Sequence, residues 1–110
     1  MATTPSSQRS LRIEQTISAD GTPTLICKGR INLESADAFR TEVKSLSPTH
    51  ATVLADLSGV DAVDSSGLGA ILGTYVSAKN DGCNLFLINV NSRVKDLLNI
   101  TKLASVIGVQ

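Results

Sequence analysis

The sequence predicts an α/β domain with a mixed, mostly parallel β-sheet and helices packed on it, in the order β-β-α-β-α-β-α-β. Two observations predict this class: short apolar runs alternate with stretches of helical period, and an Asp20-Gly21 turn joins the first two runs. Strands separated by helices pair in parallel, whereas strands joined by a tight turn pair antiparallel. The 110 residues suffice for one such domain.

The first two strands form a hairpin at the start of the domain. Residues 11–17 and 24–28 carry apolar side chains on either side of the Asp20-Gly21 turn. Residues 1–10 are polar and show no pattern. We therefore expect a disordered tail over residues 1–10 and a domain over residues 11–110.

A first helix is expected after Gly29. Asn32 is its expected N-cap, and Pro48 prevents its continuation because proline lacks the backbone N–H that a helix needs. Its apolar face contains Ala36, Phe39, Val43 and Leu46.

The third strand is a short apolar run that the Ser58-Gly59 pair ends. Its nearly continuous apolar composition is typical of a strand covered on both faces. It contains Val53, Leu54, Ala55 and Leu57.

The helix after this strand begins at two serines and ends before Gly82. Ser65 or Ser66, following Asp64, has the oxygen that caps the N–H groups of the first turn. An apolar stripe at helical spacing is expected to face the core: Leu68, Ile71, Leu72, Tyr75, Val76 and the stem of Lys79.

The opposite side of the same helix carries no charge. It consists of Ser66, Gly69, Ala70, Gly73 and Ser77. Two glycines, each costing up to about 1 kcal/mol relative to alanine, stand where packing does not require them. Either another backbone lies close to these glycines, or a partner docks on them.

A fourth strand, a short helix and a fifth strand complete the chain. Residues 83–88 form the fourth strand, and Asn91 or Ser92 caps the helix. Val94, Leu97 and Leu98 are expected to face inward, with Ile100 as a further candidate. Residues 106–109 are the fifth strand.

The composition excludes several classes of partner. Ten basic and ten acidic residues give no net charge, so there is no electrostatic footprint for nucleic acid or anionic lipid. No apolar run approaches the roughly 18 residues of a membrane span, and the first ten residues lack the apolar core of a signal peptide. We expect a cytoplasmic protein without a membrane or direct nucleic-acid partner.

No residue set for catalysis, metal binding or cofactor binding is found. His50 is the one histidine and is expected in a solvated loop, while Cys27 and Cys83 lie inside apolar runs and are expected to be buried. The glycines of G-L-G-A-I-L-G lie within a helix rather than in a phosphate-binding loop. Three carboxylates are expected to be strand-end and turn residues: Asp56, Asp61 and Asp64. We therefore expect no metal, no cofactor and no enzymatic activity.

The D-S-S-G segment is the remaining candidate for chemistry. Asp-Ser is a common helix N-cap, so capping alone is one interpretation. A serine at an exposed helix N-terminus is also accessible to a kinase, and a phosphate there meets free N–H groups and the positive end of the helix dipole. That phosphate would add close to two negative charges beside Asp61 and Asp64, next to the uncharged face.

The run V-L-A-D-L-S-G-V-D-A-V-D-S-S-G-L-G-A-I-L resembles the signature of the STAS domain and, within it, the stand-alone anti-sigma factor antagonists of bacteria. The resemblance covers roughly residues 11–109, including the turn from Gly29 to Asn32 and the stretch L-I-N-V-N-S-R-V-K-D-L-L. It implies that Ser65, the first serine after the aspartate, is phosphorylated by the anti-sigma factor, a serine kinase with a histidine-kinase-like ATPase fold. It further implies that the unphosphorylated protein binds this kinase and frees a sigma factor, and that phosphorylation releases it.

The expected partner-binding residues surround Ser65: Asp61, Asp64, Ser66, Gly67, Gly69, Ala70, Gly73, Ser77 and Asn32. Asn32 departs from the family pattern, which has an aspartate at this place. The chain also ends at Gln110, where relatives carry a further helix, so we expect one sheet face to be less covered and to favour weak homo-oligomers. The alternative function is a STAS subunit of a membrane lipid-transport or stressosome-like complex, bound permanently, with the serine acting only as a cap.

Overall fold

The computed structural model describes residues 6–7 and 10–109. In this part of the chain, six strands form one sheet in sequential order. They are β1 (Ser6–Ser7), β2 (Leu11–Ile17), β3 (Pro23–Ile31), β4 (Thr52–Val63), β5 (Asn84–Ile88) and β6 (Gly108–Val109). The β1–β2 and β2–β3 pairs are antiparallel and the later pairs are parallel, which confirms the predicted mixed sheet.

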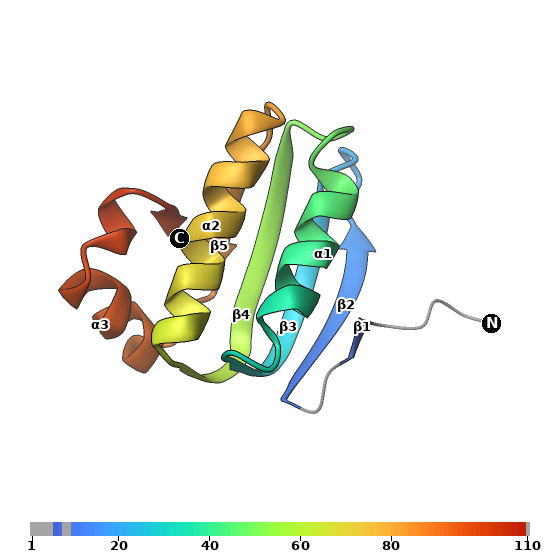
Figure 1. Cartoon of the computed structure of the whole chain (residues 1–110). Coiled ribbons are helices and arrows are strands. Elements are labelled where there is room, and N and C mark those ends of the chain that lie inside the picture. Colours follow the sequence, from blue (N-terminus) through green and yellow to red (C-terminus); the bar gives the residue numbers. More distant parts are fainter. Residues whose placement is uncertain (1–5, 8–9, 110) are drawn as a thin grey trace.

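Three α-helices connect the parallel strands. They are α1 (Ala36–Leu46), α2 (Ser65–Asn80) and α3 (Ser92–Ile100), and a 3₁₀ turn, η1 (Leu103–Ser105), precedes β6. α1 and α2 lie side by side on one face of the sheet, whereas α3 lies to the side of this layer (Figure 1). The predicted element order is confirmed, with β1 and η1 as additions.

The core lies between the sheet and the layer of α1 and α2. Alternate residues of the central strands point into it because successive side chains of a strand face opposite sides. Its largest fully buried members include Leu25, Ile31, Phe39, Leu57, Ile71, Leu85 and Leu87. Both cysteines are buried as predicted.

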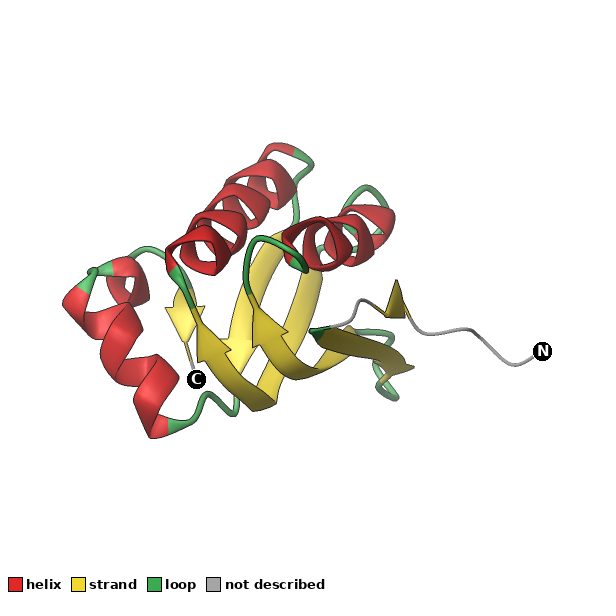
Figure 2. Cartoon of the chain, turned by 60° about the horizontal axis from the view of Figure 1, so that its bottom comes forward, coloured by secondary structure: helices red, strands yellow, loops and turns green. Residues whose placement is uncertain are grey.

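The other face of the sheet is not covered by a helix of the described residues (Figure 2). It carries four half-buried apolar side chains that alternate with core positions: Ile26, Leu54, Phe86 and Ile88. The weak self-association expected from a less covered face stays a prediction.

β4 is longer than predicted, because it continues through Ser58-Gly59 to Val63. Its register against β3 shifts twice, so that β4 has one more residue than β3 near Ser58 and again near Asp61. These bulges break the alternation of buried and exposed residues. The prediction that the strand ends at Ser58-Gly59 is therefore wrong, and Asp61 belongs to the strand rather than to a loop.

The N-terminal boundary also differs from the expected one. Ser6 and Ser7 pair with β2, and Ser10 is buried, with its carbonyl accepting a 2.6 Å hydrogen bond from the Arg30 N–H. A Cβ at Gly29, which has φ +116°, would lie only 2.2 Å from this same carbonyl oxygen. The rest of the expected tail, residues 1–5 and 8–9, lies outside the described residues.

Asn32 does not cap α1, which begins four residues later with Ser35 in the N-cap position. Its side-chain Oδ1 instead accepts hydrogen bonds from the Ser35 N–H and the Ser10 hydroxyl, each at 3.2 Å. The Ser35 hydroxyl donates to the Arg30 carbonyl at 2.8 Å. The amide thus closes the turn between β3 and α1, and this local competition delays the helix.

The orientation of α2 differs in part from the predicted one. The buried residues are Gly67, Ile71, Thr74 and Ala78. Leu68, Leu72 and Tyr75 are only half-buried, and Val76 is 49% exposed. Apolar residues occur on most sides of this helix, so periodicity alone did not determine which side faces the core. The small residues on its buried side allow close packing.

The side chain of Asn91 links the start of α3 to β4. Asn91 Oδ1 accepts a hydrogen bond from the Val94 N–H at 2.9 Å, and Asn91 Nδ2 donates to the Val60 carbonyl at 2.6 Å. Val94 and Leu98 face inward as predicted. The inward assignment of Ile100 is wrong, because its side chain is 77% exposed.

Candidate functional site

The N-terminus of α2 presents Ser65 at the surface. Asp64 is the N-cap, and its Oδ1 accepts a 2.8 Å hydrogen bond from the Gly67 N–H. The prediction that Ser65 or Ser66 caps the helix is therefore wrong. Ser65 is exposed, and its hydroxyl makes no hydrogen bond to another described residue. This hydroxyl is free to react without loss of the cap.

Gly67 holds this turn against the end of β3. A Cβ at residue 67 would lie 1.9 Å from the carbonyl oxygen of Ile31, so only glycine allows the approach. The Asp64 N–H donates to the same oxygen at 3.3 Å. Gly67, predicted as a partner-binding residue, is thus buried, in close contact with the end of β3.

The other predicted residues of the first turn lie at different depths. Ser66 is half-buried, and Asp64 is exposed beside Ser65. Asp61 is exposed and borders a small open pocket of ≈ 430 Å³ with Asn91, Ser92 and Arg93. Asn32 is half-buried and directly follows Ile31, so it lies at the same end of the sheet as the start of α2 (Figure 1).

The uncharged face of α2 is partly exposed. Around a Cβ built at Gly69 or at Gly73 there is nothing within 4 Å, which removes close backbone packing as the reason for these glycines. Ala70 and Ser77 are half-buried. The exposed part of the predicted face therefore consists chiefly of the two glycines.

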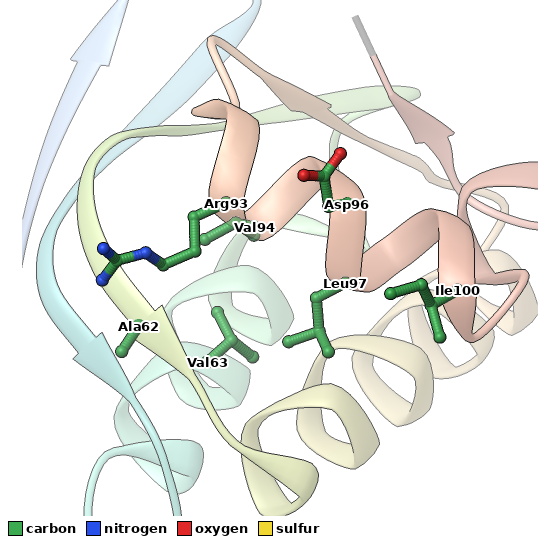
Figure 3. A pocket seen from close by; sticks show the side chains of 7 residues that line it. All are labelled: Ala62, Val63, Arg93, Val94, Asp96, Leu97 and Ile100. Atoms are coloured by element: carbon green, nitrogen blue, oxygen red, sulfur yellow. The ribbon is translucent and has the colours of Figure 1, made fainter.

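A cleft next to this site was missed by the sequence analysis. It has a volume of ≈ 370 Å³ and lies between the end of β4 and one side of α3. Figure 3 shows the seven side chains that line it: Ala62, Val63, Arg93, Val94, Asp96, Leu97 and Ile100. Ile100 is the residue that could have indicated this cleft in the sequence. It is an apolar residue at the end of a short helix, and Val94 and Leu98 already fill the inward face of that helix.

Metal-ligating and nucleophilic side chains do not cluster in the part of the chain that the structure describes. Among the described residues, no three His, Cys, Asp or Glu side chains group as metal ligands would. His50 is half-buried, with Nδ1 3.0 Å from the Leu46 carbonyl oxygen at the end of α1. Burial raises the pKa of the Cys27 thiol to about 12, so this thiol is not a nucleophile. None of the described helices has the length and apolar character needed to cross a membrane.

Comparison with known proteins identifies the class. Residues 15–110 match the STAS domain, and the chain belongs to this family. The chain is 33% identical over 81 residues to the anti-sigma-B factor antagonist of Bacillus subtilis, a match that spans 74% of each protein.

Solved structures show the same fold. An anti-sigma factor antagonist from Mycobacterium paratuberculosis superposes with a TM-score of 0.76 at 18% identity, over 97% of this chain and 88% of that one. The unphosphorylated Bacillus antagonist SpoIIAA gives a TM-score of 0.71 at 15% identity, over 89% and 87% of the two chains. Its phosphorylated form gives 0.66 at 14% identity, over 89% and 90%.

Proposed function

We propose that this chain is an anti-sigma factor antagonist whose binding to an anti-sigma factor is switched by phosphorylation of Ser65. The observation that carries the proposal is the exposed Ser65 hydroxyl, which begins α2 while Asp64 supplies the cap. The name of the Bacillus subtilis relative supports the antagonist function. A structural neighbour that exists in unphosphorylated and phosphorylated forms supports the switch.

In this proposal the chain is a binding module of the cytoplasm and not an enzyme. Its partner is the anti-sigma factor, a serine kinase with a histidine-kinase-like ATPase fold, and the unphosphorylated chain sequesters it and frees the sigma factor. The partner-binding residues are those exposed beside Ser65: Asp61, Asp64, Gly69 and Gly73, with Asn32, Ser66, Ala70 and Ser77 half-buried around them.

Electrostatics explains how a phosphate would act at this place. It adds close to two negative charges beside the exposed carboxylates of Asp61 and Asp64. A partner that covers Ser65 must then remove water from a dianion in an already acidic surrounding, which costs several kcal/mol unless a cation compensates. The phosphorylated chain therefore dissociates.

Phosphate mapping tests this assignment. The purified chain is incubated with Mg-ATP and a serine kinase of the anti-sigma factor class from the same organism, and the modified residue is located by mass spectrometry. We expect phosphate on Ser65, none on the Ser65→Ala variant, and normal labelling of the matched Ser66→Ala variant. Phosphate on Ser66 or Thr74 with Ser65 unmodified refutes the assignment, and stable binding without any phosphate favours a permanently bound STAS subunit.

A further inference from the structure

Two apolar side chains are far more exposed than the other large apolar residues of the described chain. Leu33 is 79% exposed and Ile100 is 77% exposed. The three others with substantial exposure lie between 49% and 55%: Ile17, Val76 and Val106. A Leu or Ile left in water forgoes the favourable free energy of burial, so their shared location matters.

Both side chains belong to the end of the sheet that presents Ser65. Leu33 follows Ile31 by two residues, and the Ile31 carbonyl oxygen contacts the first turn of α2. Ile100 lines the cleft with Ala62 and Val63, which directly precede Asp64 and Ser65 (Figure 3). The turn after β3 and the connection from β4 to α2 run side by side at the lower end of the molecule (Figure 1). Because β4 lies between β3 and β5 in the sheet, Leu33 lies on the β3 side and Ile100 on the α3 side of the β4–α2 connection that leads to Ser65.

The two flanks differ in shape and are both held in place. Leu33 projects from a turn that the Asn32 and Ser35 hydrogen bonds close. Ile100 lines a cleft on α3, a helix that Asn91 links to β4 at its start and that the buried side chains of Val94 and Leu98 pack into the core. Both features exist before a partner arrives, so little ordering is needed on binding.

We propose that Leu33 and Ile100 are apolar anchors for the anti-sigma factor, which binds across the Ser65 end and buries both at once. This inference rests on the proposed function, because the partner is the protein that phosphorylates Ser65. An apolar floor with one basic and one acidic side chain at the rim, Arg93 and Asp96, is the arrangement of a protein interface. Leu33 inserts into a pocket of the partner, and an apolar partner side chain enters the cleft beside Ile100.

The two anchors also account for the strength of the switch. Contacts on both sides of Ser65 exclude water from the serine between them, as residues around a binding hot spot do. A phosphate at the centre of a dry interface costs more than one at its edge, because its charge loses more water. The apolar contacts thus make the interface sensitive to the phosphate without touching it.

Affinity measurements on single variants test the anchors. The anti-sigma factor that labels Ser65 is titrated by calorimetry, in its ADP-bound state to prevent phosphorylation, with unphosphorylated wild-type chain and with Leu33→Ala, Ile100→Ala and Ile17→Ala. Ile17 is the matched control, because it is 55% exposed and pairs with Pro23 at the opposite end of β3. We expect each anchor variant to bind roughly ten-fold or more weakly and the control to bind as wild type.

Melting temperature and sedimentation complete the test. The anchor variants should melt within a few degrees of wild type, because the deleted side chains are largely in water already. Unchanged affinity for either anchor variant, or an equal loss for Ile17→Ala, overturns the inference while leaving the proposed function intact. A change of oligomeric state in the anchor variants also overturns it, because the two side chains then bind a second copy. Failure of the wild type to bind overturns the proposed function itself.

Discussion

Replacing Gly67 by alanine is expected to destabilise the protein although alanine is the better helix former. A Cβ there would lie 1.9 Å from the Ile31 carbonyl oxygen, and ordinary contact begins at 3.4 Å, so the first turn of α2 must retreat by about 1.5 Å. That movement breaks the 3.3 Å hydrogen bond from the Asp64 N–H to the same oxygen.

The sizes of the opposing energy contributions decide whether Gly67→Ala raises or lowers the free energy of unfolding. Overpacking costs about 1–3 kcal/mol, and the lost hydrogen bond costs about 1 kcal/mol more. The gain from replacing glycine within a helix is at most about 1 kcal/mol. Gly67→Ala should therefore lower the free energy of unfolding by about 1–3 kcal/mol.

Urea unfolding followed by circular dichroism measures this difference, and Gly69→Ala is the matched control. Nothing lies within 4 Å of a Cβ at Gly69, so that variant should gain up to about 1 kcal/mol from helix propensity alone. If Gly67→Ala is as stable as Gly69→Ala, the close approach of α2 to β3 does not exist as described.

Three further substitutions follow from the same structure. Thr74→Val should raise the free energy of unfolding by about 1 kcal/mol, because the buried Thr74 hydroxyl makes no hydrogen bond in the described chain. A loss of stability measured by calorimetry would instead show that this hydroxyl has a hydrogen-bond partner. Hydrogen bonds from Lys44 and Ser47 lower the pKa of Asp81 below its ordinary 3.8. The ionised carboxylate therefore stabilises the fold above pH 3.8. This contribution is lost as the pH falls from 3.8 through the lower pKa of the folded state. Asp81→Asn should thus flatten the decline of melting temperature in that range, and an unchanged slope would contradict this. Gly73→Lys should keep or raise stability by up to about 1 kcal/mol but weaken partner binding tens- to hundreds-fold, and unchanged affinity on titration would exclude this face from the interface.

The order of strands and helices along the chain was predictable because most of these elements have a strong local pattern. The errors occur where a tertiary contact overrides that pattern. β4 passes through Ser58-Gly59 because two bulges in β4 take up its two extra residues while it stays paired with β3, and a single sequence does not reveal such bulges. Asn32 has the right chemistry for an N-cap, yet its amide closes a turn with Ser10, a residue 22 positions away.

The candidate site was predictable in its centre but not in its surroundings. The D-S-S-G run locates Ser65 at the start of an exposed helix, because its residue types favour that place. Gly67 was assigned to the partner-binding surface because the sequence alone does not distinguish a buried glycine from an exposed one. The cleft beside Ile100 depends on how α3 crosses the end of β4, a packing geometry set by Asn91 and absent from any local pattern.

The proposed switch is measured by the affinity of the anti-sigma factor for the chain before and after phosphorylation of Ser65. Isothermal titration is performed with the unphosphorylated chain and with the chain carrying phosphate on Ser65 alone, under the same salt conditions. We expect the phosphate to weaken binding by at least about one hundred-fold, or about 2.7 kcal/mol, because a dianion must lose its water between Asp61, Asp64 and the partner. Equal affinity of the two forms would contradict it.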